Sequence, residues 1–168
     1  MIDEVLAEGD VTLRDLDAIG VGTGPGNFTG IRISVSAARG LALSLNIPAV
    51  GVSLFEALAV GTDGPLLRTI AAPRGEVYYM GPADNGITQG AIEDIPAQAA
   101  GTVAVGERSD DVAAHLGIPS QPAAFAAAAA IARVAATRWH GDVKPPAPLY
   151  VRAADAAPSR TVAPEITS

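Results

Sequence analysis

The hydrophobic residues of the first 60 positions follow two different periods. Ile2, Val5 and Leu6 are spaced as on one face of a short helix. Residues 17–22 and 49–52 are instead short continuous apolar runs, which are typical of buried strands. With helices between and after them, these runs predict parallel strands joined by a right-handed crossover. The predicted helices are residues 2–7, 27–45 and 54–60.

The pattern changes after residues 61–65, whose sequence Gly-Thr-Asp-Gly-Pro is typical of a turn. Beyond it, two apolar runs that flank a Pro-Arg-Gly turn at 73–75 predict an antiparallel hairpin. The whole pattern predicts an α/β protein with a first part at 1–60, a second at 66–140 and a Pro-rich tail at 141–168. The expected strands of the second part are 66–72, 76–80, 87–92 and 102–105, and its expected helices are 110–116 and 122–139.

Composition narrows the possible functions. The chain has 168 residues, a net charge of −7 and no cysteine. Because affinity for nucleic-acid phosphates comes from Lys and Arg, a chain this acidic is a poor nucleic-acid binder by itself. The lack of cysteine excludes thiolate nucleophiles and Cys-based metal sites. The acidic N-terminus is unlike a signal peptide, and no apolar run reaches the roughly 18 residues of a membrane span, so we expect a cytoplasmic protein.

The densest glycines lie between the first predicted strand and the long helix. Gly22, Gly24 and Gly26 set the geometry of this loop, and a loop before a helix can hold phosphate on free backbone N–H groups. The known phosphate motifs match poorly. No P-loop lysine is present, and Asn27 stands where a G-x-G-x-x-G fingerprint begun at Gly22 needs glycine. A kinase-like enzyme that binds nucleotide through residues 22–30 is the alternative function.

The long helix carries small or apolar residues on nearly every side, which indicates burial on more than one side. One stripe of small residues has a spacing of four, so that another helix could approach closely. A neighbouring face carries Ile33, Ala37 and Ser44. We expect one side to face the chain's own sheet, and the sequence leaves open whether the other side packs on a second helix of the same lobe or on a partner subunit. The stripe consists of Gly30, Ser34, Ala38 and Ala42.

Catalytic constellations are missing. His115 and His140 are far apart and neither belongs to H-x-x-x-H or H-E-x-x-H, so the sequence offers no ligand set for a metallopeptidase. Ser53 falls short of a G-x-S-x-G motif, because Phe55 replaces the second glycine, and is better explained as a helix N-cap. The better polar candidates, for which surface roles are the default, are Arg32, Arg39 and Arg74.

Several segments resemble one protein family. The sequence GPGNFTGIRI at 24–33, followed by ARGLA at 38–42, closely resembles the signature of the TsaB family. The resemblance continues in the same order over nearly the whole chain, and its other segments are weak individually. They are IDEVLA at 2–7, LRDLDAI at 13–19, PAVGVSLFEALA at 48–59, RGEVY at 74–78 and PLYVR at 148–152.

The resemblance implies two RNase H-like lobes of the ASKHA type, shared with actin and sugar kinases, the first shortened at its N-terminus. It also implies a non-catalytic scaffold that supports a TsaD-like catalytic subunit in forming threonylcarbamoyladenosine next to the tRNA anticodon. A TsaE-like ATPase completes that complex. ATP and metal are therefore expected on the partner subunits and no cofactor in this chain. Contact with tRNA is expected only through the complex, and none with a membrane.

The family's partner-binding surface is built from its first helix and the helix after the Gly-rich loop. These correspond to residues 2–7 and 28–45 here. We therefore expect both helices to bind a TsaD-like subunit, or a second copy of the chain in a homodimer. The expected interface residues are Ile2, Val5, Leu6, Phe28, Gly30, Ile31, Ser34, Val35, Ala38 and Ala42.

The chain also departs from the family pattern. Asn27 replaces the usual serine, and Ala72 replaces the aspartate that usually precedes the hairpin tip. Family members open with strands that carry an A-x-D-T-S-like signature, and this chain shows none. Without them the first sheet would have two strands and an exposed edge. We therefore expect poor solubility or folding that depends on the partner.

Overall fold

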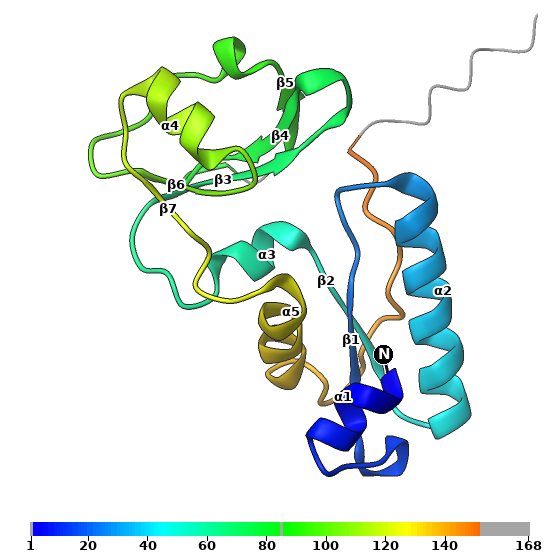
Figure 1. Ribbon diagram of the computed structural model, residues 1–168. Coiled ribbons are helices and arrows are strands. Elements are labelled where there is room, and N and C mark those ends of the chain that lie inside the picture. Colours follow the sequence, from blue (N-terminus) through cyan, green and yellow to red (C-terminus); the bar gives the residue numbers. More distant parts are fainter. Residues whose placement is uncertain (1, 85, 152–168) are drawn as a thin grey trace, which may run out of the picture.

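The computed structural model describes residues 2–84 and 86–151 as an α/β structure with two sheets (Figure 1). Strands β1 (Ile19–Gly22) and β2 (Ala49–Val52) form a parallel pair. A mixed five-stranded sheet has the order β5-β4-β3-β6-β7. Its strands are β3 (Leu66–Ala71), β4 (Val77–Met80), β5 (Thr88–Gly90), β6 (Val103–Gly106) and β7 (Ser120–Gln121).

Except for α5, the helices and most predicted strands agree with the sequence pattern to within a few residues. The predicted hairpin is the antiparallel β3–β4 pair, joined by the 3-10 turn Pro73–Gly75. Asn46 ends the long helix in the left-handed conformation that a C-cap favours. The helices are α1 (Ile2–Glu8), α2 (Phe28–Leu45), α3 (Leu54–Ala59), α4 (Ser109–Leu116) and α5 (Ala127–Ala136), with further 3-10 turns at Leu13–Asp15 and Ile92–Asp94.

The two faces of the small sheet are covered by different helices. Along β1, Ile19 and Val21 pack with α2, and the alternate positions Gly20 and Gly22 face α5. A Cβ atom added at Gly20 would lie 2.9 Å from the Cβ of Ala135. Glycine therefore lets α5 lie directly against the β1 backbone. Within the described ranges β1 pairs only with β2, and the expected dependence of folding on a partner stays a prediction.

The last described segment, residues 141–151, lies on the α2 side of the small sheet, and we call it the C-terminal strap. It runs without regular structure beside β2 and α2 (Figure 1). A Cβ atom at Gly51 of β2 would come within 3.0 Å of the Cβ of Pro146. The Leu149 N–H donates a hydrogen bond to the Thr23 carbonyl at 2.8 Å. The strap is therefore docked on the Gly-rich loop at Leu149, and residues 152–168 of the predicted tail lie outside the described residues.

The structure differs from the predicted pattern around α5. This helix covers Ala127–Ala136 rather than all of 122–139, and its Ile131 and Ala135 join the core of the small sheet with Val50 and Val52. Its main packing is therefore against the first predicted part of the chain, through β1, β2 and α3. The pattern also missed β7, which has only two residues and pairs with Ala104 and Val105 in the middle of β6. The predicted boundaries at 60, 66 and 140 stay a prediction.

Candidate partner-binding surface

The inner face of α2 is part of the protein's own core. Val35, Ala38 and Ala42 are 3%, 9% and 3% exposed, and Val35 and Ala38 pack with Val21 of β1. The stripe of four small residues is therefore divided. Its C-terminal half touches the sheet, and Gly30 and Ser34 are exposed. Val35, Ala38 and Ala42 are therefore buried within the chain's own fold, and their expected place in a partner interface stays a prediction.

The face of α2 that points away from the sheet is open. Ile33, Ala37, Gly40 and Ser44 are spaced by four, three and four residues, so they lie on one side of the helix, and all are exposed. Ile33 is 64% exposed, and a Cβ atom at Gly40 would meet nothing within 4 Å. We call these four residues, with Gly30, the outer face of α2. It is small, smooth and apolar, which suits close contact with another backbone.

Helix α1 also presents apolar side chains to solvent. Ile2 is 57% and Val5 63% exposed, Leu6 is half-buried, and no residue of α1 is buried. Phe28, at the start of α2, is 44% exposed, and its neighbour Ile31 turns inward toward Val21 and Val35. Of the expected interface residues, the structure therefore leaves Ile2, Val5, Phe28, Gly30 and Ser34 accessible to a partner.

The Gly-rich loop holds its shape through backbone contacts. Gly24 has φ +103, a conformation that favours glycine, and a Cβ there would lie 2.7 Å from the Cδ1 atom of Ile31. Its carbonyl accepts a hydrogen bond from the Leu54 N–H at 2.8 Å. Asn27 caps α2 by accepting the Gly30 N–H at 2.8 Å. This cap uses one of the backbone donors that a bound phosphate would need.

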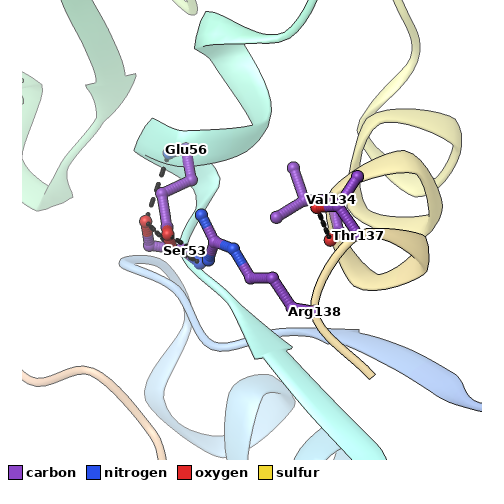
Figure 2. Close-up of polar contacts among 5 residues, drawn as sticks. All are labelled: Ser53, Glu56, Val134, Thr137 and Arg138. Carbon is purple, nitrogen blue, oxygen red and sulfur yellow. Dashed lines mark hydrogen bonds and ion pairs between the residues drawn. The ribbon is translucent and has the colours of Figure 1, made fainter. Parts of the chain in front are cut away.

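Helices α3 and α5 are joined by a polar cluster at their ends (Figure 2). The Ser53 and Glu56 side chains form a capping box at the start of α3, and the Arg138 guanidinium donates to Glu56. Burial raises the pKa of the Glu56 carboxyl, but the Ser53 N–H and Arg138 outweigh it, so that its pKa lies below the ordinary value. Thr137 donates to the Val134 carbonyl at 2.8 Å and closes the end of α5. The cluster is structural, because every group in it has a partner within it.

A cavity of about 420 Å³ lies between α3, the segment that leads into α5, and the β3 and β6 strands of the five-stranded sheet. Its walls are mostly apolar and include Leu58 and Phe125. The Thr69 hydroxyl donates to the Glu107 carbonyl at 2.8 Å, and the Glu107 carboxylate accepts the Ala71 N–H at 2.9 Å. A carboxylate in the wall repels phosphate, so the cavity is a poor site for a nucleotide phosphate.

The two histidines lie on different parts of the fold. His115 lies in α4, and His140 stacks on Trp139 with ring centroids 3.9 Å apart. Across the described residues, no group of three or more His, Cys, Asp or Glu side chains is placed to hold a metal ion. In the same part of the chain, no helix is long and apolar enough to span a bilayer.

Comparison with known proteins adds sequence relatives. The model of the family "TsaD: tRNA N6-adenosine threonylcarbamoyltransferase" matches residues 1–150. An uncharacterized protein of Mycobacterium tuberculosis is 35% identical over 163 residues, which cover 91% of this chain and 72% of that protein. The Escherichia coli tRNA threonylcarbamoyladenosine biosynthesis protein TsaB is 39% identical over 84 residues, which cover 47% of this chain and 36% of TsaB.

Solved structures show the same fold. A Pseudomonas aeruginosa protein, described as similar to the peptidase YEAZ, superposes with a TM-score of 0.70 at 24% identity over 90% of this chain and 81% of that one. YeaZ of the same organism superposes with a TM-score of 0.61 at 23% identity, over 82% of this chain and 75% of that one. At these identities the likeness establishes the fold and says nothing of a peptidase activity.

Proposed function

Because this chain belongs to the family of TsaD and its TsaB relatives, we propose that it is a non-catalytic scaffold that binds a TsaD-like catalytic subunit. The complex forms threonylcarbamoyladenosine next to the anticodon of tRNA in the cytoplasm. A TsaE-like ATPase completes it, and the partner subunits hold ATP and metal. In this proposal the small sheet and the five-stranded sheet correspond to two RNase H-like lobes.

One observation carries the proposal: each of the two helices that the family resemblance assigns to partner binding exposes large apolar side chains. Ile2 and Val5 on α1 and Ile33 on α2 are each more than half exposed. Burying one large aliphatic side chain contributes roughly 1.5–3 kcal/mol. A partner that covered these three side chains would therefore gain a substantial part of a specific affinity.

The arrangement of polar groups supports the non-catalytic role. The described residues bring together no set of His, Cys, Asp or Glu side chains that could hold a metal. The polar cluster around Glu56 and Arg138 is satisfied internally. A catalytic partner that supplies the reacting groups fits these observations better than chemistry performed by this chain.

The test is binding to the TsaD-like subunit encoded in the same genome. We expect Ile33→Asp to weaken the complex by at least about 30-fold, because it places a charge in the centre of an apolar contact. Ala114→Asp is the matched control, since Ala114 is exposed on α4, a helix that packs on the five-stranded sheet and is far from α2 in sequence. Equal affinity of the wild type and Ile33→Asp would contradict the proposal.

Two further measurements separate the alternatives. Sedimentation of the chain alone and with its partner distinguishes a homodimer through the same helices from a heterodimer. Calorimetry with ATP, ADP and magnesium tests the kinase-like alternative at residues 22–30. Tight nucleotide binding by the chain alone would favour that alternative, whereas the capped Gly30 N–H and the missing P-loop lysine lead us to expect none.

A further inference from the structure

The start of α2 and the C-terminal strap meet in a cluster of one arginine and two aromatic rings, which we call the aromatic clamp. Its members are Phe28, Arg32 and Tyr150. The guanidinium carbon of Arg32 lies 3.8 Å from the centroid of the Phe28 ring and 5.6 Å from that of Tyr150. Arg32 Nε donates to the Tyr150 hydroxyl at 2.8 Å, and the two ring centroids are 5.1 Å apart. The rings therefore fix the position of the positive charge.

The fixed guanidinium keeps unused hydrogen-bonding capacity. Its Nε atom is bonded to Tyr150, but within residues 2–84 and 86–151 its two Nη atoms have no hydrogen-bond or ion-pair partner. By contrast, Arg108 and Arg138 each pair with a carboxylate of this chain. Phe28 and Tyr150 are 44% and 46% exposed. The clamp therefore presents the two Nη groups of Arg32 and the exposed parts of the Phe28 and Tyr150 rings to a binding partner.

We propose that the aromatic clamp is the charged anchor of the partner surface and that its ligand is an Asp or Glu carboxylate of the TsaD-like subunit. This inference rests on the proposed function. Arginine and aromatic residues carry much of the binding energy at protein interfaces. An arginine already held in position loses less conformational entropy when it binds a carboxylate through two parallel hydrogen bonds.

The position and charge of the clamp favour a protein carboxylate over a nucleic-acid phosphate. The clamp lies at the start of α2, on the side of this helix that meets the strap, and its Phe28 is one of the expected interface residues. The chain as a whole has a net charge of −7. That charge repels a polyanion, whereas one carboxylate on a protein needs only one fixed guanidinium.

Tyr150 acts in this scheme as a positioning residue. It stacks on Phe28 and accepts the Arg32 Nε–H, and the strap that carries it is fixed one residue earlier by the bond from the Leu149 N–H to Thr23. The carboxylate itself would meet the Nη atoms of Arg32. Tyr150→Phe keeps the ring and removes the acceptor, so we expect a smaller loss of affinity than from loss of the Arg32 charge.

The experiment compares Arg32→Met with Arg39→Met in binding to the TsaD-like subunit. Methionine keeps much of the stem that packs on the rings and removes the charge. Arg39 is the matched control, because it lies two turns further along the same side of α2 and is exposed. We expect Arg32→Met to weaken binding about 10- to 30-fold at low salt and less at high salt, with Arg39→Met within about twofold of the wild type.

Each outcome decides the inference. If the wild type binds and Arg32→Met binds equally well, the anchor is wrong and the proposed function stands. If the wild type does not bind, both are wrong. If Arg32→Met weakens binding equally at low and high salt and lowers the melting temperature, the clamp is only structural and the inference fails. Weaker binding of Arg32→Met to tRNA, with unchanged affinity for the subunit, would identify a phosphate site and also overturn it.

Discussion

The two faces of α2 have similar side chains and opposite surroundings. Ala38 and Val35 on the inner face are buried against β1, whereas Ala37 and Ile33, one and two positions away, are exposed. Helical periodicity alone therefore does not distinguish them. The difference comes from the position of the small sheet, which covers one side of the helix and leaves the other open. A small apolar helix face thus indicates close packing without saying whether the neighbour belongs to the same chain.

Glutamate substitutions at positions 37 and 38 test this contrast, and Ala38→Glu has the largest expected effect on the free energy of unfolding. Ala38→Glu places an unpaired carboxylate in the core beside Val21, and we expect it to lower the free energy of unfolding by at least about 3 kcal/mol. Ala37→Glu adds the same group on the outer face, where water solvates it, and we expect a change within about 0.5 kcal/mol. Urea denaturation followed by circular dichroism measures both.

The same pair also separates folding from binding. Ala37→Glu should weaken the complex with the TsaD-like subunit although the chain alone keeps its stability. Equal losses of stability at positions 37 and 38 would show that the outer face is not open in solution. Unchanged partner binding by Ala37→Glu would remove the outer face from the proposed interface.

The sequence pattern predicted what depends on local chemistry. The predicted N-cap Ser53 accepts the Glu56 N–H at the start of α3, and the Pro-Arg-Gly turn at 73–75 joins the predicted hairpin. These features involve neighbours a few residues apart. The Gly-rich loop was located for the same reason, since dense glycines mark sharp backbone turns.

Features that depend on distant parts of the chain were not predictable in this way. The expected stripe mixed the inner Ala38 with the exposed Ser34 because spacing does not show where the sheet lies. The aromatic clamp joins Arg32 to a tyrosine 118 residues away, and neither segment carries a local sign of the other. The sequence pattern of α5 predicted a helix. It did not show that this helix packs against the β1 backbone at Gly20.

A glycine substitution on the opposite side of the small sheet has the next largest expected effect. In Gly20→Ala the added methyl group would lie 2.9 Å from the Ala135 Cβ and 3.2 Å from the Ile131 Cγ2. We expect it to push α5 away from β1 and to lower the free energy of unfolding by about 1–3 kcal/mol. Thermal melting measures the loss, and a melting temperature equal to that of the wild type would show that α5 packs less closely than described.

The outer face has its own glycine, and there we expect the opposite sign. Gly40 lies inside α2 with open space around it, so Gly40→Ala should stabilise the chain by about 0.5–1 kcal/mol through better helix propensity. If a partner backbone packs closely on this face, the added methyl group should also weaken the complex. Higher stability with unchanged affinity would mean that the partner does not approach Gly40, and lower stability would mean that the site is not exposed.

The smallest expected effect tests whether the two sides of the small sheet act independently. The pKa of Glu56 is lower in the folded chain than its ordinary value, so the carboxylate contributes stability above that ordinary pKa. This contribution is lost as the pH falls through the lowered pKa of the folded state. Because Glu56 and Arg138 are both partly exposed, solvent screening limits their pairing to about 0.2–1 kcal/mol. Denaturation across the acid range should therefore show a slightly flatter pH dependence of the free energy of unfolding for Glu56→Gln than for the wild type.

The affinity of Glu56→Gln for the partner should be unchanged, because the Glu56–Arg138 pair joins α3 to α5, and β1 lies between α5 and α2. A loss of partner binding in Glu56→Gln would show that the α5 side influences the outer face through the sheet, and the two faces of α2 could then no longer be treated as separate.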